Sequence, residues 1–142
     1  MLIRHIMAAK PVSVSPEESI LLASRLLFRY NIGSLPVCSA DGTLRGVITD
    51  RDIVLRCVAL GDSPASTSVS SAMSRCVYAV SPDDDVSRAV LLMSDAQVRR
   101  LPVAENGRLV GVVSLCDIAR LRSLSAETAS VLAGISCGIR GV

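Results

Sequence analysis

Two short segments of this 142-residue chain carry a hydroxyl side chain followed by a carboxylate three residues later. They are residues 46–52 (GVITDRD) and residues 111–117 (GVVSLCD). The hydroxyls are Thr49 and Ser114, and the acids are Asp52 and Asp117. This spacing is typical of a capping box, in which hydroxyl and acid close the start of a helix. It also suits a nucleotide, because helix N-termini bind phosphate and a carboxylate accepts hydrogen bonds from a ribose diol. The sequence leaves both interpretations open.

Each segment begins with a glycine, Gly46 or Gly111, which permits a close backbone approach. A hydroxyl for phosphate, a carboxylate for ribose and neighbouring apolar residues for a base together describe a nucleotide site. The alternative is a helix start with no ligand.

The rest of the composition offers little for other chemistry. There is a single histidine, His5, and the five cysteines are scattered without a CxxC pair. A zinc cluster is therefore not predicted, and neither is a nucleophile–base pair. The cysteines are expected to be small buried side chains in a reducing cytosol. We predict a protein that is not an enzyme.

The charge balance argues against other classes of partner. Fifteen basic residues against thirteen acidic ones give a net charge of +2, not the one-signed surface that nucleic acids or anionic membranes attract. Two Tyr and one Phe leave little for stacking on bases. No apolar run reaches the ~18 residues of a membrane span, and no signal peptide is read. We expect a cytoplasmic protein.

An internal repeat organises the chain. Residues 14–37 match residues 80–103, and after a one-residue deletion residues 42–53 match residues 107–118. The matches include VSPEE with VSPDD and LPV with LPV, in the same order. Such self-similarity indicates two copies of one supersecondary unit.

Each copy predicts the order β-α-β-β-α, which is an α/β (α+β) fold class. The strands are expected at 12–14, 35–38 and 44–48, and at 78–80, 101–104 and 109–113. Asp41-Gly42 and Asn106-Gly107 predict tight hairpin turns. A second helix is expected to start at Asp50 and at Leu115.

The first helix of each copy is expected to begin at a Ser-Pro pair. Ser15 and Ser81 would be the N-caps, with Pro at the first helical position and acidic residues in the first turn. Apolar residues in steps of three and four follow, at 20, 23, 27 and 30 and at 86, 89, 93 and 96.

These patterns predict four parts: a first unit at 1–60, a small polar linker at 61–72, a second unit at 73–124, and a C-terminal helix and tail at 125–142. The helix at 19–30 is apolar beyond its main stripe. This surplus, with its counterpart at 83–96, predicts a homodimer.

The duplicated unit, the Leu-Pro-Val strings, the Gly-x-x-[Thr/Ser]-x-x-Asp motifs and the string TDRDI at 49–53 resemble the CBS (cystathionine β-synthase) domain. Over about 1–124 the chain resembles a stand-alone tandem CBS pair, also called a Bateman module. The resemblance implies two units packed as a pseudo-twofold pair that commonly dimerises. It also implies a regulatory module with no required cofactor, which binds AMP, ADP, ATP or S-adenosylmethionine in clefts between the units.

Carried over by this resemblance, the two acids match the ribose-binding positions, and the two hydroxyls match the phosphate side. Arg51, Arg99 and Arg100 are candidate phosphate partners. The walls around the base would come from the first strands and the stretches around Leu-Pro-Val. Those wall residues are Ser13, Ile32, Pro36, Ala79, Val98 and Pro102.

The two expected sites are not equal. The first has Asp50-Arg51 inside its motif where the second has Leu115-Cys116. The second has Arg99-Arg100 where the first has Gly33-Ser34. Against the ligand sensor stands a dimerising interaction scaffold with empty clefts. In either case the output goes to a separate protein effector, which the sequence does not name.

Overall fold

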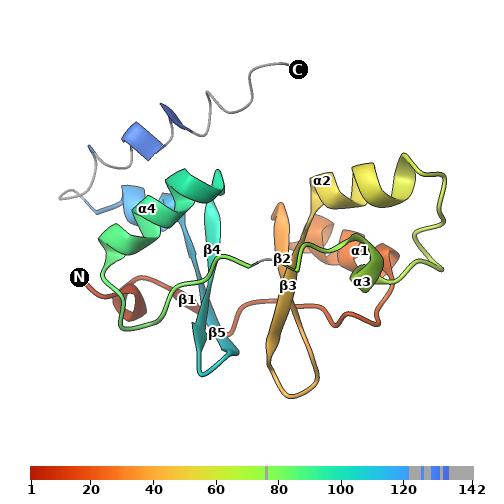
Figure 1. Cartoon of the computed structure of the whole chain (residues 1–142), viewed down its shortest axis with the longest axis horizontal. Coiled ribbons are helices and arrows are strands. Elements are labelled where there is room, and N and C mark those ends of the chain that lie inside the picture. Colours follow the sequence, from red (N-terminus) through yellow and green to blue (C-terminus); the bar gives the residue numbers. More distant parts are fainter. Residues whose placement is uncertain (76, 122–125, 127–128, 132, 135–142) are drawn as a thin grey trace. The chain divides into compact units, whose positions relative to one another are not determined.

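The computed structural model describes residues 1–75, 77–121, 126, 129–131 and 133–134. Contacts divide the chain into two compact units that do not follow sequence order. Unit 1 joins Met1–Pro11 and Tyr78–Asn106 with the residues from Val110 onward, whereas unit 2 is Val12–Val77 with Gly107–Leu109. Helices and strands occur in both, so the predicted α/β (α+β) class is confirmed (Figure 1).

Unit 2 is built around a hairpin. Its elements are α1 (Ile20–Tyr30), β2 (Ser34–Cys38), β3 (Leu44–Thr49), α2 (Asp50–Ile53), the π-helical turn η2 (Val54–Val58) and α3 (Val69–Ala72). β2 and β3 are antiparallel, with Leu35 opposite Ile48. Gly42 has φ +86 in the turn, a conformation that glycine adopts without strain. The hairpin predicted from Asp41-Gly42 is therefore confirmed.

Unit 1 repeats this plan with one extra strand. Its elements are η1 (Ile3–His5), β1 (Ala8–Ala9), α4 (Val86–Ala96), β4 (Arg100–Glu105), β5 (Arg108–Ser114) and α5 (Leu115–Ala119). The sheet order is β1-β5-β4. The strands expected at 12–14 and 78–80 are reduced to single parallel bridges, Val14 with Val37 and Val80 with Val103.

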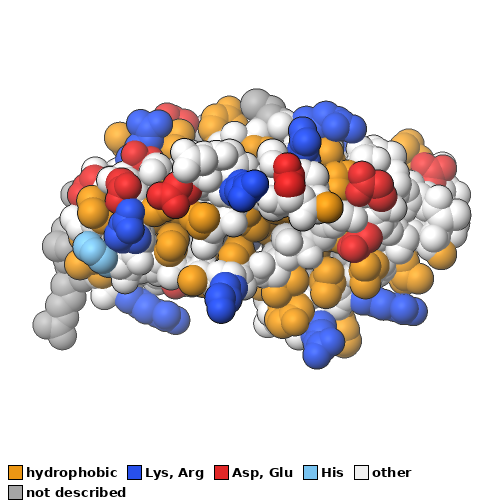
Figure 2. Space-filling model, turned by 90° about the horizontal axis from the view of Figure 1, so that it is seen from below, with side chains coloured by type: hydrophobic (Ala, Val, Ile, Leu, Met, Phe, Trp, Pro, Cys, Tyr) orange, Lys and Arg blue, Asp and Glu red, His pale blue; other side chains and the backbone are white. Residues whose placement is uncertain are grey.

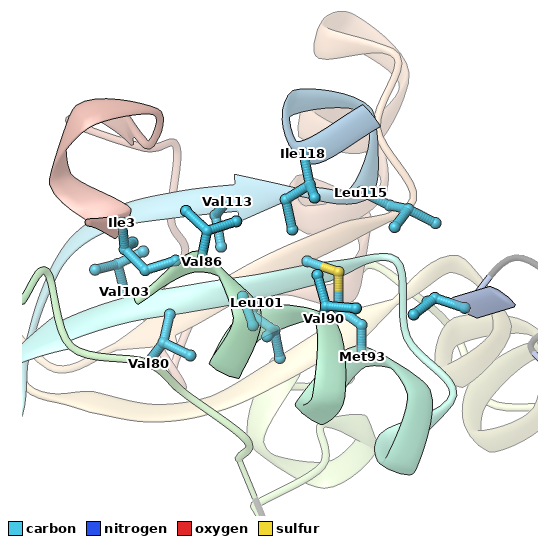
Figure 3. Packing of buried hydrophobic residues seen from close by; sticks show 12 residues of the cluster. Ile3, Val80, Val86, Val90, Met93, Leu101, Val103, Val113, Leu115 and Ile118 are labelled. Carbon is cyan, nitrogen blue, oxygen red and sulfur yellow. The ribbon is translucent and has the colours of Figure 1, made fainter. Parts of the chain in front are cut away.

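Each unit has its own apolar core. In unit 2, α1 contributes Ile20 and Ala23, which pack with Leu35 and Ile48 of the hairpin. In unit 1, Figure 3 shows side chains of α4, β4, β5 and α5 converging with Ile3 from the start of the chain. Burying one such side chain contributes about 1.5–3 kcal/mol. The predicted helical spacing is confirmed, except that Tyr30 is exposed.

The first residues of the chain belong to unit 1 and are replaced in unit 2 by the segment before residue 75. In unit 2, Val69 N donates to Glu18 O at 2.8 Å, and Ile20 N donates to Thr67 O at 2.9 Å. In unit 1, Ile3 N donates to Asp84 O and Val86 N donates to Met1 O, both at 2.9 Å. Residues 1–8 and 67–74 thus make matching contacts. Residues 1–8 precede the first repeat copy but pack with the second, and residues 67–74 precede the second copy but pack with the first. We call them the exchanged segments.

This exchange changes the meaning of the expected linker at 61–72. The stretch ends in α3, where Val69 and Ala72 are fully buried in the core of unit 2. The sequence boundaries 1–60, 61–72, 73–124 and 125–142 remain a prediction about the repeat. The compact units are assembled from discontinuous pieces of it.

The predicted starts of the first helices are wrong. The N-caps are Ser19, which accepts from Leu22 N, and Asp85, which accepts from Ser87 N, and the first turns hold no acidic residue. The reason is that carbonyls of the turn are already engaged. Pro16 O accepts from Ser70 N, and Pro82 O accepts from Arg4 N. The amides that would close a helical turn onto these carbonyls, Ile20 N and Val86 N, donate instead to Thr67 O and Met1 O.

Part of the C-terminal region is described. Residues 126, 129–131 and 133–134 are helical, and Val131 is buried in the core of unit 1. The remainder of the helix and tail predicted at 125–142 lies outside the described residues. Among the residues described, no helix combines the length and the apolar character needed to cross a bilayer.

Candidate functional site

In unit 2 the candidate site lies where β3 ends and α2 begins. Thr49 is the N-cap in extended conformation, and its Oγ1 accepts a hydrogen bond from Asp52 N at 3.0 Å. In return, Thr49 N donates to Asp52 Oδ2 at 3.0 Å. These reciprocal bonds are a complete capping box, so the structural interpretation is confirmed here.

Unit 1 has the same junction between β5 and α5. Asp117 N donates to Ser114 Oγ at 3.1 Å, and Ser114 N donates to Asp117 Oδ2 at 2.9 Å. The Ser114 hydroxyl also donates to Asp117 Oδ2, at 2.7 Å. Ser114 is buried, and this second capping box is held by three hydrogen bonds.

In both junctions one carboxylate oxygen lies outside the capping box. Oδ1 of Asp52 is 3.8 Å from Arg56 Nη1, and Oδ1 of Asp117 is 3.9 Å from Arg120 Nη1. These are ion pairs beyond hydrogen-bond distance. The Asp52 side chain is 13% exposed and that of Asp117 is 28% exposed. Each acid therefore caps its helix with one oxygen and keeps the other as an acceptor.

The two arginines of these ion pairs are not singled out by the sequence analysis. The available signal is their helical spacing, since Arg56 is four residues after Asp52 and Arg120 three after Asp117. Arg56 is also held by the end of α3, donating from Nη1 to Ala72 O at 3.1 Å. Arg56 thus links the acid of unit 2 to the exchanged segment.

The start of the preceding strand lies directly against each junction. Asp50 N donates to Gly33 O at 3.0 Å, and Leu115 N donates to Arg99 O at 2.8 Å. A Cβ on Gly33 would lie 3.5 Å from Asp50 Oδ2, so this carboxylate is at van der Waals distance. The unequal pairs noted in the sequence, 33 with 50 and 99 with 115, are therefore neighbours in space.

Arg51 and Arg99 are exposed, and so is Arg100. Among the described residues none of the three forms an ion pair. Their expected contact with phosphate stays a prediction.

The residues expected around the base lie on or beside the hairpin strands. Pro36 and Pro102 are buried in β2 and β4, and their carbonyls accept from Val14 N and Val80 N, each at 3.1 Å. Ser13 and Ala79, which immediately precede these donors, are thus next to the same strands. Ile32 and Val98 are half-buried against the two cores. Their roles as base contacts stay predictions.

The two glycines do permit a close backbone approach, but the approaching backbone is the exchanged segment. A Cβ on Gly46 would lie 2.5 Å from Ser74 O. A Cβ on Gly111 would lie 2.7 Å from Met7 Sδ and 3.0 Å from Ala8 O. Both glycines therefore admit residues 67–74 or 1–8 beside the hairpin.

Three cysteines fall among the free thiols of the described residues. Cys38 and Cys57 are buried, as predicted, whereas Cys116 in the first turn of α5 is exposed. Burial raises the pKa of the Cys38 thiol, and a hydrogen bond with the Ser13 side chain opposes that rise. Over the part of the chain that the structure describes, no three His, Cys, Asp or Glu side chains gather into a metal site.

Comparison with known proteins places these junctions in a family. The CBS domain model matches residues 3–58 and 69–123. The CBS domain-containing protein YhcV of Bacillus subtilis is 36% identical over 134 residues, covering 94% of each chain. Hypoxic response protein 1 of Mycobacterium tuberculosis is 36% identical over 117 residues, covering 82% of each chain.

Solved structures agree. That of Hypoxic Response Protein I, described with two coordinated zinc ions, has a TM-score of 0.80 at 35% identity, covering 84% of this chain and 98% of the other. A CBS domain pair in complex with 5′-methylthioadenosine and S-adenosyl-L-methionine has a TM-score of 0.75 at 29% identity, with the same coverage. With two matched domains and relatives along nearly its whole length, this chain belongs to the CBS domain family and is a tandem CBS protein.

Proposed function

We propose that this chain is a regulatory module that binds an adenosine-containing ligand at its two strand-to-helix junctions. The observation that carries the proposal is the division of each carboxylate. Asp52 and Asp117 cap their helices through Oδ2, and Oδ1 remains available to accept from a ribose diol. The capping box thus fixes the direction of the acceptor.

The ligand class follows from the groups around each acid. In this proposal Thr49 and Ser114 lie on the phosphate or sulfonium side of the nucleoside, and Arg99 and Arg100 of unit 1 are the partners for phosphate. Base contacts are assigned to the residues beside the hairpins, which are Ser13, Ile32 and Pro36 in unit 2 and Ala79, Val98 and Pro102 in unit 1. Support comes from the CBS domain pair that holds 5′-methylthioadenosine and S-adenosylmethionine.

The proposal contains no chemical step and no metal. One relative is an L-aspartate semialdehyde sulfurtransferase from Methanocaldococcus jannaschii, 31% identical over 121 residues. This chain covers only 23% of that protein. In this proposal, ligand binding changes how the module interacts with a separate protein effector. The free thiols of Cys38, Cys57 and Cys116 support a reducing, cytoplasmic setting.

A thermal-stability panel tests the proposal. AMP, ADP, ATP, S-adenosylmethionine and guanosine nucleotides are each added to the full chain. A ligand present at 100 times its Kd stabilises the folded state by about 2.7 kcal/mol. We expect such a shift with at least one adenosine compound and none with the guanosine compounds. No shift with any adenosine compound would favour the ligand-free scaffold.

A second proposal, homodimerisation, is supported by an exposed apolar surface on unit 2. We define the unit 2 apolar face as Leu22 and Phe28 of α1, Val54, Leu55 and Val58 of η2, and Leu60. Phe28 is 89% exposed and Leu60 is 69% exposed. Figure 2 shows hydrophobic side chains at the surface in the part of the view where unit 2 is drawn.

The corresponding helix of unit 1 lacks such a face. On α4 the one exposed large hydrophobic residue is Leu91, and Ser94 stands where α1 has Phe28. The equivalent helices α1 and α4 thus differ in how apolar their exposed side chains are. Exposed apolar patches of several side chains are unusual in monomers. We therefore assign the unit 2 apolar face to a second copy of the chain.

A further inference from the structure

The two junctions differ in charge at positions that the fold places in contact. In unit 2 the backbone pair is Gly33 with Asp50, whose carboxylate lies beside the glycine. In unit 1 the equivalent pair is Arg99 with Leu115, which is buried. Unit 2 thus has a carboxylate at this pair of positions, and unit 1 has a guanidinium group.

The neighbouring charges strengthen this difference. The unit 2 junction combines the acids Asp50 and Asp52 with Arg51 and Arg56. Arg56 is engaged, since Nη1 donates to Ala72 O at 3.1 Å and to Met73 O at 3.3 Å. The two acids of this junction are thus matched in number by two arginines, of which Arg51 forms no ion pair with any residue that the structure describes.

In unit 1 the arginines are in excess. Asp117 is the single acid of the junction, accompanied by Arg99, Arg100 and Arg120. Arg120 lies 3.9 Å from Asp117 Oδ1. Arg99 and Arg100 are exposed and form no ion pair with any residue that the structure describes. The guanidinium groups of Arg99 and Arg100 can therefore bind an anionic ligand.

We propose that the two junctions select adenosine ligands of different charge. The unit 1 junction binds a polyphosphorylated adenosine, and the unit 2 junction binds an adenosine without phosphate, either neutral or cationic at its 5′ substituent. Guanidinium groups form paired, charge-assisted hydrogen bonds to phosphate. The exposed Asp50 carboxylate of the other junction repels phosphate and attracts a sulfonium. This inference rests on the proposed function, since it assigns a ligand class to each of its sites.

The test uses calorimetric titration of the full chain with ATP and, separately, with 5′-methylthioadenosine. The main variant is Arg99→Gln with Arg100→Gln, which keeps two polar side chains and removes both charges. The control is Arg25→Ser with Arg45→Ser, which removes the same charge from exposed positions elsewhere. We expect the main variant to weaken ATP binding at least tenfold and to leave 5′-methylthioadenosine binding within about twofold. The control should change neither.

Two further variants assign each ligand to its junction. Asp117→Asn should weaken ATP binding by about 10- to 100-fold, and Asp52→Asn should weaken 5′-methylthioadenosine binding by the same factor. Equal loss of ATP affinity in the control, or ATP binding lost through Asp52→Asn rather than Asp117→Asn, would overturn the charge selectivity. Absence of binding of both ligands to the wild type overturns instead the proposed function. Binding of both ligands at one junction overturns only the present inference.

Discussion

Asp52 accepts the backbone N–H of Thr49 through Oδ2 at 3.0 Å, and its Oδ1 takes no part in that bond. Asp117 holds Ser114 in the same way. The two interpretations of the motif, helix cap and ligand site, therefore use different oxygens of one carboxylate. This separation permits variants that remove one role and keep the other.

The first prediction concerns the cap alone. Asp52→Ala removes the acceptor of Thr49 N, and we expect a loss of about 1 kcal/mol in the free energy of unfolding, the usual cost of a lost N-terminal cap. Asp52→Asn retains a side-chain oxygen for the same bond and should lose clearly less. Denaturant titration measures both. Equal losses in the two variants would show that Oδ2 does not act as a cap.

The second prediction concerns the glycines. Gly46→Ala places a Cβ 2.5 Å from a backbone carbonyl of the exchanged segment, which cannot move without displacing Met73 from the core. We expect destabilisation of about 1–3 kcal/mol, the range for overpacking. Gly33→Ala is the matched control, because its Cβ meets the nearest atom at an ordinary 3.5 Å. An equal effect of the two substitutions on the unfolding midpoint would contradict the assigned role of Gly46.

The third prediction concerns assembly. Phe28→Ser gives α1 the residue that α4 carries at the matching position, Ser94, and removes the most exposed side chain of the unit 2 apolar face. We expect wild-type chain to sediment as a dimer at micromolar concentration and the variant to shift toward monomer. Leu91→Ser, which removes an apolar residue 65% exposed on α4, is the control and should stay dimeric. A monomeric wild type sinks the dimer.

The fourth prediction concerns thiol reactivity. Cys116 is exposed, whereas Cys38 is buried and burial raises the pKa of its thiol. Because the thiolate is the reactive form, alkylation near pH 8 should modify Cys116 before Cys38, which should react only on unfolding. Peptide mass spectrometry after timed labelling reports the order. Early labelling of Cys38 would contradict its burial.

The raised pKa of Cys38 also has a consequence for stability. The folded state holds the neutral thiol, so this contribution is fully present below the pKa of the unfolded thiol and is lost as pH rises through the pKa of the folded one. Between neutral and alkaline pH, the free energy of unfolding should therefore fall less in Cys38→Ser than in wild type. A steeper alkaline loss in the variant would contradict this sign.

Much of the fold follows from the sequence because both repeat copies keep the residues that mark turns and helix starts. The Asp41-Gly42 turn, the apolar steps of the first helices and the hydroxyl–acid spacing each have a local physical cause, and each is confirmed. The exchanged segments escape prediction because they bind through backbone atoms. Residues 1–8 (MLIRHIMA) and 67–74 (TSVSSAMS) share few side chains, yet make matching hydrogen bonds.

The same cause explains the misplaced helix starts. Ser15-Pro16 is a strong local start signal, but the carbonyl of Pro16 is taken by Ser70, far along the chain. Local signals give way when a distant backbone claims the same group. The candidate site follows a similar rule. The local spacing predicts the hydrogen bonds between Thr49 and Asp52. The surroundings of Asp52 Oδ1 depend instead on Arg56, which α3 holds in place through Ala72 O.

The most direct test of the central claim is calorimetric titration of wild type, Asp52→Asn and Asp117→Asn with ATP and with S-adenosylmethionine. Asn keeps an oxygen for the cap and places an amide N–H2 group where the ribose acceptor would be. Asp95→Asn, an exposed acid on α4, is the control. Hydrogen bonds to charged groups are worth roughly 1.5–3 kcal/mol. Each junction variant should therefore lose about 10- to 100-fold in affinity for one ligand, with its unfolding midpoint nearly unchanged. Wild-type binding that neither variant weakens would contradict the ribose assignment and leave both motifs as helix caps.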